Sequence, residues 1–485
     1  MASLSSAAAD PRDDCDAFYG PLIGTSYPLV VRATATKGKS GFARAKIQEG
    51  SVCFAEKPLV CLQSLQNRFD VPTCSRCHVH VGDVEEQVDL LARRVTPAEY
   101  AAHRAGWRIS DRKVSDANNS IFSCKAGCGI LYCSNTCLDA HWTEGHCFLC
   151  TGPCNDDHPL GEFKRHAIQT NEIFLLAATV VGKIYARYLE LLDTPAITEN
   201  RNVDVNAASG AKCDFIRFVA NPWWSVAWPE NSSDPEEKRH LEKTLYELAT
   251  ESFNLLRLSF LAQTGRNADA WDTLFNVEYY GCIIGMFEQN NLGVQVHSPI
   301  MNTLRAVSDS EGNLPSEIMN ILEPVLEEIE EIGFWEEGNA EDVHSHDGHT
   351  HGQEEEEDED DTEGHEEEVA EEAFAVAVED LRQYFPPLDG TALFSVICCL
   401  NHSCAPNVRV EWSPPGEAPQ AKEAFHNFDQ KNEALQAKIV ALRDIEEGEE
   451  LCFSYIDTSL PIHERRMKLR DYGFLCECAR CLSEQ

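Results

Sequence analysis

Short apolar runs separated by glycine-containing turns fill residues 28 to 62, "PLVVRATATKGKSGFARAKIQEGSVCFAEKPLVCL". Runs of this length, broken by turn residues, are typical of β-strands. The same pattern returns at residues 392 to 412 and 438 to 456, where "EEGEE" is expected to turn between Ile445 and Leu451. The hydrophobic pattern therefore predicts β-strands in two parts of the chain that lie far apart in sequence.

Between these parts the apolar spacing changes to that of helices. In "HAIQTNEIFLLAATVVGKIYARYLELLD" apolar residues recur every three or four positions, which predicts a helical stretch with one buried face. That face is expected to carry Ile173, Leu176, Val180 and Ile184. The tryptophan-rich connector "NPWWSVAWP" (221–229) is interpreted as a packing corner between two helices.

A second helix is predicted to begin near residue 235. Ser233 or Asp234 can cap it, Pro235 suits its first turn, and the acidic Glu236 and Glu237 suit the positive end of its dipole. Further along, four leucines are expected to form a buried stripe: Leu241, Leu245, Leu248 and Leu255.

Cysteine is the unusual feature of the composition, with 21 residues among 485. No apolar run approaches the roughly 18 residues of a membrane span, and the N-terminus "MASLSSAAADPRDD" lacks the regions of a signal peptide. We therefore expect a soluble intracellular protein, in the nucleus, the cytoplasm or both. Disulfides rarely persist in such compartments, so clustered cysteines favour metal binding.

The net charge of −41 is concentrated in one stretch. Between Glu327 and Asp380 there are 25 acidic residues and no Lys or Arg, which predicts a disordered, solvated linker. The simpler interpretation is that this linker is an insertion without a function of its own. The alternative is that its negative charge attracts basic substrates or partners. Such a charge argues against direct nucleic-acid binding, because phosphate binding needs clustered Lys and Arg.

Four ligand pairs in the central part of the chain have the spacing of zinc sites. Eight ligands complete two tetrahedral sites, because a short loop lets two sulfurs reach one ion without strain. Two substitutions stay open: His141 could replace His146, and Cys147 could replace Cys150. The predicted pairs are Cys74 with Cys77, Cys124 with Cys128, Cys133 with Cys137, and His146 with Cys150.

A third cluster closes the chain. "CECARC" supplies Cys476, Cys478 and Cys481, which leaves a tetrahedral site one ligand short. Cys404, in "NHSCAPN", is the natural fourth ligand. A third zinc ion is therefore expected to tie the C-terminal tail to this segment.

Three motifs carry a resemblance to a known family. "NHSCAPN", "DIEEGEELCFSYID" and "CECARC" resemble the core and post-SET motifs of SET-domain protein lysine methyltransferases. The block with "YCSNTC" and "HWTEGHCFLC" resembles an inserted MYND zinc finger. Together they are similar to the SET-and-MYND family, especially its divergent fifth member and the plant trithorax-related counterpart, over nearly all of residues 25 to 485.

The resemblance implies an α+β fold: a β-rich SET domain with an inserted MYND zinc finger, a helical insert and a zinc-binding post-SET tail. The expected division is 25–73 for the N-terminal SET part, 74–150 for the finger, 151–326 for the helical insert, 327–384 for the acidic linker, 385–457 for the C-terminal SET part and 458–485 for the post-SET cluster.

The resemblance also implies the chemistry, which is transfer of a methyl group from S-adenosylmethionine to a neutral lysine amine. Tyr455 is expected to be the catalytic residue, with its hydroxyl near the transferring methyl and the amine; Phe453 and Tyr472 are either channel aromatics or core. The alternative interpretation of Tyr455 is a tyrosine on a strand that packs into the core. The expected cofactor-binding residues are Lys39, Ser40, Gly41, Asn290, Asn401, His402, Tyr455 and Phe474.

We therefore expect a histone-lysine or other protein-lysine N-methyltransferase, a chromatin regulator acting as a monomer on a basic substrate such as a histone tail or a ribosomal protein. The alternative is a zinc-scaffolded interaction module with an inactive SET fold in transcriptional regulation. The presence of Asn401, His402 and Tyr455 together favours the enzyme. A zinc-finger nucleic-acid regulator is disfavoured by the charge.

Overall fold

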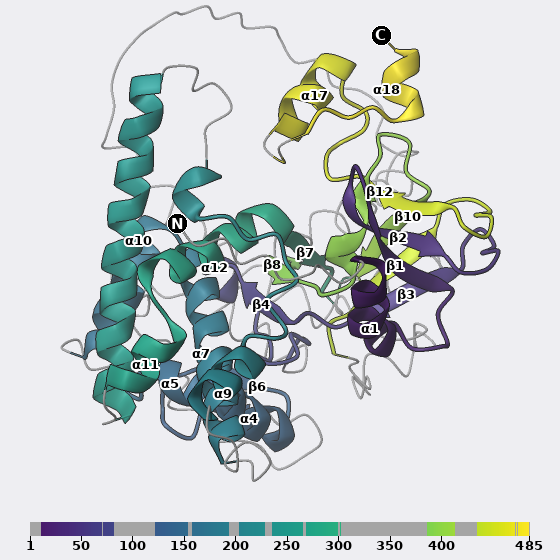
Figure 1. Cartoon of the computed structure of the whole chain (residues 1–485). Helices are drawn as coiled ribbons and strands as arrows, with labels where there is room; N and C mark the ends of the chain where they lie inside the picture. Colours follow the sequence, from purple (N-terminus) through teal and green to yellow (C-terminus); the bar gives the residue numbers. More distant parts are fainter. Residues whose placement is uncertain are drawn as a thin grey trace, which may run out of the picture.

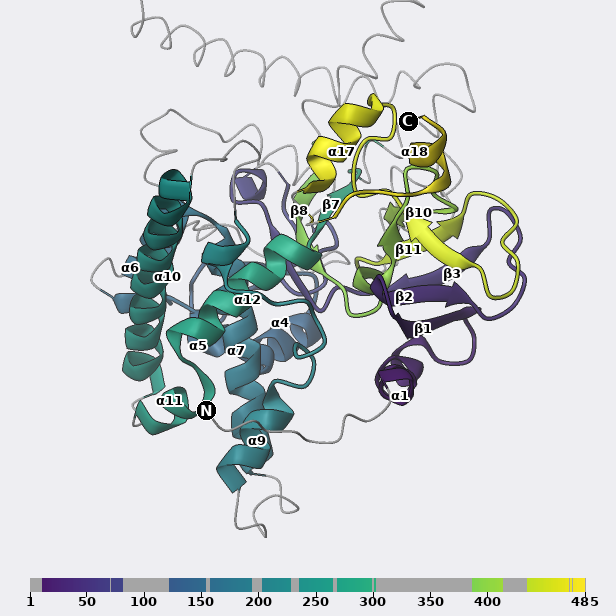
Figure 2. The same cartoon turned by 45° about the horizontal axis from the view of Figure 1, so that its top comes forward.

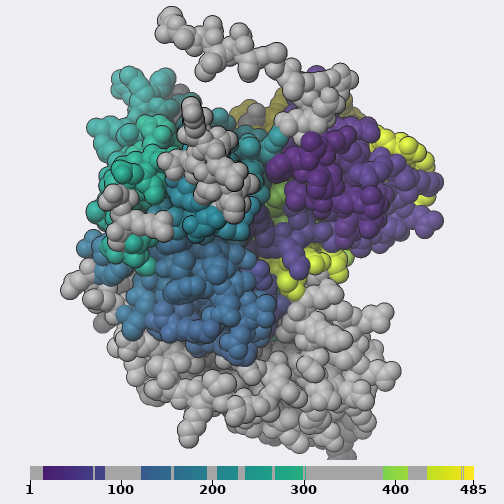
Figure 3. Space-filling model, turned by 60° about the horizontal axis from the view of Figure 1, so that its bottom comes forward, coloured from purple at the N-terminus to yellow at the C-terminus, as the bar shows by residue number. Residues whose placement is uncertain are grey.

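The computed structural model describes residues 11–69, 71–81, 122–153, 158–193, 203–227, 235–264, 268–298, 301, 386–412, 434–470, 472 and 474–484. Strands gather on one side of the molecule and helices on the other (Figure 1). In space-filling view, the described residues between 122 and 290 form one lobe beside the N-terminal strands (Figure 3). The predicted acidic linker lies outside the described residues.

The sheet that positions the site joins distant parts of the chain. Its strand order is β1 (Leu29–Thr34), β2 (Gly38–Ala43), β12 (Glu450–Phe453) and β9 (Asn401–His402). The first two neighbouring pairs are antiparallel, whereas β12 and β9 are parallel. Because of this order, residues near 40, 401 and 452 become neighbours in one sheet.

Two three-stranded sheets complete the β-rich part. One joins β10 (Val408–Trp412), β11 (Ala437–Ala441) and β3 (Val52–Glu56), and the other joins β4 (Val60–Gln63), β8 (Leu388–Leu393) and β7 (Leu292–Val296). Helix α1 (Pro11–Ile23) packs against β1. The predicted strand regions are therefore confirmed, with Gly448 in the turn before β12 at a φ of 84°.

The predicted first helical stretch is divided into two helices. Helix α6 (Pro159–Thr170) ends before Asn171, whose side chain accepts a hydrogen bond at 3.0 Å from the amide of Ile173, the first residue of α7 (Ile173–Leu192). The expected face of α7, from Ile173 to Ile184, is buried as predicted. Helix α9 (Val203–Ala211) packs against α7.

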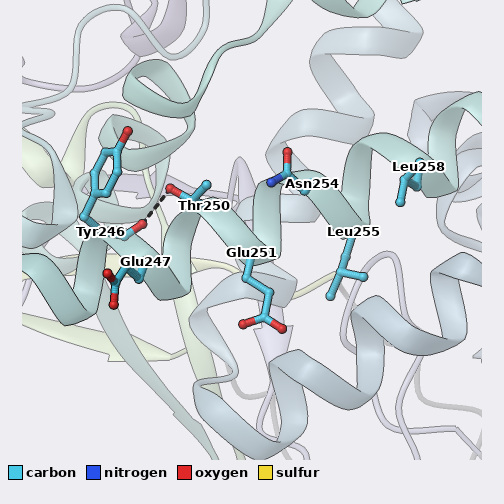
Figure 4. A pocket seen from close by; sticks show the side chains of 7 residues that line it. All are labelled: Tyr246, Glu247, Thr250, Glu251, Asn254, Leu255 and Leu258. Carbon is cyan, nitrogen blue, oxygen red and sulfur yellow. Dashed lines mark hydrogen bonds between the residues drawn. The ribbon is translucent and has the colours of Figure 1, made fainter.

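The leucine stripe predicted for helix α10 (Pro235–Thr264) is displaced. Its four leucines are only partly buried, because the rings of Phe253 and Phe260 take the centre of the interface by packing on Trp271 of α11 (Ala268–Leu274), with centroids 5.6 and 5.1 Å apart. The buried residues of α10 are Ala249, Ser252, Phe253, Leu256, Ser259 and Phe260. Leu255 instead borders a shallow depression on the outer face (Figure 4).

The tryptophan connector is a packing corner, as predicted for its described part. It forms the short helix η3 (Trp223–Ser225) against α12 (Val277–Asn290). Trp223 is buried and donates a hydrogen bond from Nε1 to Glu288 at 3.0 Å. A Cβ on Gly281 would lie 2.3 Å from the Trp224 ring, so α12 needs glycine at this contact.

The cysteine-rich block docks onto α7. It contains β5 (Phe122–Ser123), β6 (Leu131–Tyr132), α4 (Asn135–His141), η2 (Trp142–His146) and α5 (Cys147–Leu149). Gly145 has a φ of 131°, and a Cβ there would lie 2.6 Å from the Gly182 carbonyl carbon. Two glycines therefore permit the close approach of η2 to α7.

The C-terminal helices α17 (Ile462–Arg470) and α18 (Ala479–Ser483) lie together at the top of the β-rich side of the molecule (Figures 1 and 2). Short 3₁₀ turns at Asn67–Phe69 (η1) and Ile397–Cys399 (η4) complete the described elements. Among the helices that the structure describes, none combines the length and the apolar character that crossing a membrane requires.

Candidate active site and metal centres

Asn401 links strand β2 to the start of strand β12. Its side-chain amide donates to Ser40 Oγ at 2.7 Å, to Glu450 Oε1 at 2.9 Å and to the Lys39 carbonyl at 3.2 Å. Burial acts to raise the pKa of Glu450, but hydrogen bonds from Lys37 and Asn401 outweigh it and lower this pKa. One amide thus fixes three segments that are far apart in sequence.

Gly41 allows the segment before Asn401 to lie directly on β2. A Cβ on Gly41 would lie 2.2 Å from Leu400 Cδ2, closer than real Cβ contacts allow. The close contact therefore depends on glycine, and it places Leu400 against β2 at the start of "NHSC".

Tyr455 follows β12 and is held at both ends. Its phenol donates to the Leu400 carbonyl at 2.7 Å, and its amide donates to His402 Nδ1 at 3.0 Å. Burial raises the pKa of the phenol well above its ordinary value. The hydroxyl therefore stays protonated at neutral pH and serves as a hydrogen-bond donor.

Aromatic rings surround Tyr455. The ring centroids of Phe453 and Tyr472 each lie 5.0 Å from its own, that of His402 lies 5.4 Å away and that of Phe474 6.4 Å away. Phe453 is buried, whereas Tyr472 and Phe474 are 43% and 37% exposed. The arrangement can exclude water around an apolar or cationic group while leaving one side open.

The remaining predicted cofactor residues have structural partners. The Lys39 ammonium donates to the Arg217 carbonyl and to the Tyr19 hydroxyl, so its side chain ties β2 to the helical part and to α1. Asn290 ends α12, and its amide donates to the carbonyls of Val219 and Met286, both at 2.7 Å. The main-chain carbonyl of Asn290 also accepts from the Cys398 thiol at 3.0 Å, so both residues are held within the fold.

The twelve predicted metal ligands come together in three groups of four. Within each group all four ligand atoms lie within 4.8 Å of one another, as tetrahedral zinc coordination requires. The groups are Cys74, Cys77, Cys133 and Cys137; Cys124, Cys128, His146 and Cys150; and Cys404, Cys476, Cys478 and Cys481. The first two groups interleave along the chain, so each ion would join segments that the other separates.

The geometry also separates the alternative ligands. His146 Nε2 lies 3.5 Å from the sulfurs of both Cys124 and Cys128. His141 instead shares a hydrogen bond with the Tyr132 hydroxyl at 3.0 Å and stacks on the His146 ring. Cys147 belongs to none of the three groups. The donor sets, four thiols or three thiols with one imidazole, fit zinc.

The C-terminal group borders the site directly. Cys404 lies two residues after His402, and its Sγ is 3.2 Å from His402 Nε2. On the other side, the guanidinium of Arg465 is 1% exposed, lies 3.8 Å from Cys481 Sγ and pairs with Glu484 at 2.5 Å. A buried cation beside four thiols offsets the negative charge that these ligands carry when they bind zinc.

Sequence reasoning missed Glu56 and Arg465. Glu56 accepts hydrogen bonds from the amides of Val396 and Ile397, at 3.0–3.1 Å, and so anchors η4 just before Leu400. Burial raises the pKa of Glu56 to about 7. Neither residue lies in a motif, and a single charged residue on a strand or helix carries no local signal of burial.

A larger cavity, of about 1190 Å³, lies away from Tyr455. It opens between the cysteine-rich block and helices α6 and α7, and its lining includes His78, Arg68 and Lys183. None of its described lining residues belongs to the aromatic cluster around Tyr455.

The sheet that joins β2, β9 and β12, the aromatic cluster around Tyr455 and the adjoining thiol groups define a SET-domain protein with zinc-binding additions. The SET domain family matches residues 41–456, and the chain belongs to this family.

Within the SET domain family, the chain is similar to several named lysine methyltransferases. Histone-lysine N-methyltransferase ATXR2 of Arabidopsis thaliana is 27% identical over 507 residues, covering 94% of this chain and 90% of the relative. Protein-lysine N-trimethyltransferase SMYD5 of Gallus gallus is 22% identical over 467 residues, with 93% and 85% covered. N-lysine methyltransferase SMYD2 of Gallus gallus is 33% identical over 97 residues, 20% of this chain and 18% of the relative. The chain is thus a SET-and-MYND protein related to SMYD5 and ATXR2, as its motifs indicated.

Proposed function

We propose that this chain transfers the methyl group of S-adenosylmethionine to a lysine amine of a basic protein, at the site around Tyr455. Family and relatives establish the class, a protein-lysine N-methyltransferase. The observation that carries the assignment of the site is the meeting of Ser40, Asn401 and Tyr455 at one sheet. Asn401 bonds to Ser40, 361 positions away in sequence, and Tyr455 follows β12, the strand between β2 and β9.

The cofactor supplies an activated methyl group when bound. We assign its binding to strand β2 at Lys39, Ser40 and Gly41, to the segment of Asn401 and His402, and to Asn290. Phe474, which is partly exposed and 6.0 Å from the His402 ring, would cover an aromatic base. The Asn401 amide holds strand β2 and the segment in register, which reduces the entropy lost on binding.

Tyr455 is assigned as the catalytic residue. Its phenol is held as a donor beside the Leu400 carbonyl, and the surrounding rings of Phe453 and Tyr472 exclude water. Such a pocket favours a neutral amine and aligns it for in-line displacement, where positioning supplies most of the rate. The proton leaves the substrate amine before transfer; no side chain of the chain needs to form a bond to the methyl group.

The three Cys/His groups are assigned to three zinc ions with structural roles. Zinc in such closed sites links segments that share too little core to pack alone. The C-terminal ion would hold the tail with Phe474 next to the segment that contains His402.

The substrate is proposed from charge and from the relatives. A net charge of −41 attracts basic segments over long range. ATXR2 is named a histone-lysine methyltransferase and SMYD5 a protein-lysine N-trimethyltransferase. We therefore propose a histone tail or a ribosomal protein as substrate, met in the nucleus or cytoplasm by a monomer that binds no nucleic acid.

The test is tritiated methyl transfer with core histones and a ribosomal protein fraction, for wild type beside Tyr455→Phe. Label on a basic protein that is lost in the variant supports the function and identifies the substrate class. A zinc-loaded protein that fails to bind S-adenosylmethionine in calorimetry, yet captures basic proteins, would instead support the interaction module.

A further inference from the structure

The His402 imidazole uses both of its nitrogens. Nδ1 accepts the Tyr455 amide hydrogen bond at 3.0 Å, and Nε2 lies 3.2 Å from Cys404 Sγ. A main-chain amide can only donate, so Nδ1 carries no proton and the neutral ring holds its proton on Nε2. The Nε2–H group therefore donates to the Cys404 sulfur.

Cys404 is a member of the C-terminal thiol group. It is 1% exposed, and its sulfur lies 3.5 Å from Cys481 Sγ and 3.9 Å from Cys476 Sγ. A thiolate that binds zinc is a good acceptor for an N–H donor, and such outer partners fix ligand orientation. Zinc in this group would thus fix the position of the sulfur and, through it, the orientation of the His402 ring.

Tyr455 depends on the same short segment at both of its ends. Its amide is held by the His402 side chain and its hydroxyl by the Leu400 carbonyl, two residues earlier. The β12–β9 pairing continues up to Phe453 and His402, so Tyr455 lies just beyond the last ladder pair. Beyond the ladder, the imidazole replaces the strand partner that would otherwise bind the Tyr455 amide.

We propose that His402 is a positioning residue that couples the C-terminal zinc group to Tyr455. Zinc bound by Cys404 orients the ring, the ring holds the Tyr455 amide, and the phenol is placed for methyl transfer. Loss of this one ion releases Tyr455 without unfolding the sheet, so the site is regulated by zinc occupancy. Only the catalytic consequence depends on the function proposed above. The link between zinc and the Tyr455 amide depends on the contacts of His402 alone.

Two substitutions separate the two arms of the link. In His402→Asn the side-chain oxygen can reach the Nδ1 position and accept from Tyr455, while the contact to Cys404 is lost. In His402→Gln the side-chain amide can reach the Nε2 position and donate to the sulfur, while the contact to Tyr455 is lost. His463→Gln is the matched control, because His463 is 77% exposed on α17.

The first measurement is zinc release to a chromophoric chelator. His402→Asn is expected to release one of three ions about 10- to 100-fold faster, with the other two unchanged, whereas His402→Gln retains all three. The second is hydrogen exchange of a peptide spanning Tyr455. Exchange should rise in wild type when the C-terminal ion is removed, and should already be high in zinc-loaded His402→Gln.

Kinetics give the third measurement. His402→Gln, which loses the contact to the Tyr455 amide, should lose about 10²-fold in kcat, whereas zinc-loaded His402→Asn, which keeps that contact, should lose clearly less. If both His402 variants release zinc and exchange the Tyr455 peptide at the same rates as the control His463→Gln, the link between the zinc group and Tyr455 is overturned. Loss of zinc, exchange protection and cofactor binding together in both variants would overturn it as well, since it would assign the ring a general structural role. If wild type transfers no methyl group, the proposed function fails while the zinc and exchange measurements still decide the link.

Discussion

The Tyr455 phenol donates a hydrogen bond to the Leu400 carbonyl at 2.7 Å, although 55 positions of sequence separate the two residues. The contact is made across the parallel pair β12 and β9, which brings Phe453 opposite His402. It fixes the direction of the hydroxyl inside a ring of aromatic side chains. The orientation of this one donor is the feature on which the proposed chemistry depends.

Replacing Tyr455 by Phe removes this donor and keeps the ring. We expect methyl transfer to fall by about 10²-fold or more, because a reacting group misplaced by an ångström can cost that much. Cofactor affinity and thermal unfolding should change little, since the ring contacts to Phe453 and Tyr472 remain. Full activity in the variant would remove Tyr455 from the mechanism.

A methyl group added at Gly41 tests the close contact with Leu400. Gly41→Ala places its Cβ against Leu400 Cδ2, so the buried Leu400 side chain must shift next to the Asn401 segment, and cofactor affinity should fall about tenfold. Calorimetric titration with S-adenosylmethionine measures the loss. The double variant Gly41→Ala with Leu400→Ala removes the clash and should regain part of the affinity.

Gly293→Ala in β7 is the matched control, because nothing lies within 4 Å of a Cβ at that position. It should bind the cofactor as wild type does. Equal losses in Gly293→Ala and Gly41→Ala would show that the close contact is not the cause.

Glu56 predicts a pH dependence of stability. Its pKa is raised by burial to about 7 from an ordinary value of 4.5, so the folded protein holds a proton that the unfolded chain has lost between these pH values. The contribution of Glu56 to the free energy of unfolding is therefore largest below pH 4.5 and declines as pH rises to about 7. The decline should amount to roughly 2 kcal/mol, with part of the full effect screened by solvent.

Urea unfolding of wild type and Glu56→Gln between pH 5 and 8 measures this decline. As pH rises, the unfolding free energy of wild type should fall relative to that of Glu56→Gln, because glutamine does not titrate. The variant should also be slightly less stable at pH 5, since its amide nitrogen cannot replace the oxygen that accepts from Val396 at 3.1 Å, although its remaining oxygen can still accept as Glu56 Oε2 does. A constant difference across this range would contradict a raised pKa.

Removal of single ligands tests the zinc groups. Cys478→Ser should lower the zinc content by one ion per chain and weaken cofactor binding, because the tail with Phe474 is then untied. Cys74→Ser should also cost one ion but leave cofactor binding largely intact. Cys213→Ser, at an exposed cysteine outside the groups, is the control and should keep all three ions. Metal content by mass spectrometry decides, and unchanged zinc in Cys478→Ser would contradict the third group.

Much of the site was predictable from the sequence because its chemistry is local. Cys74 and Cys77 are close in the chain, so a short loop alone brings their sulfurs together. The "NHSC" and "GEELCFSY" motifs likewise carry their own pattern. Apolar periodicity was sufficient for the strands and for α7, because burial on one face repeats at a fixed interval.

The tertiary structure decided which distant groups meet. Spacing could not say that Cys77 shares its group with Cys133 rather than with Cys124, since that depends on how the chain crosses itself. It also could not find the buried face of α10, because the large rings of Phe253 and Phe260 outcompete leucines of suitable spacing.

The sequence by itself determined the candidate ligands, the strand regions and the class of enzyme, since each is written in short motifs. The fold alone decided that His402 lies between Cys404 and the Tyr455 amide, and that Glu56 holds the turn before Leu400. Both contacts join segments that only sheet pairing brings together. Their effect comes from burial and from direction, which no local pattern records.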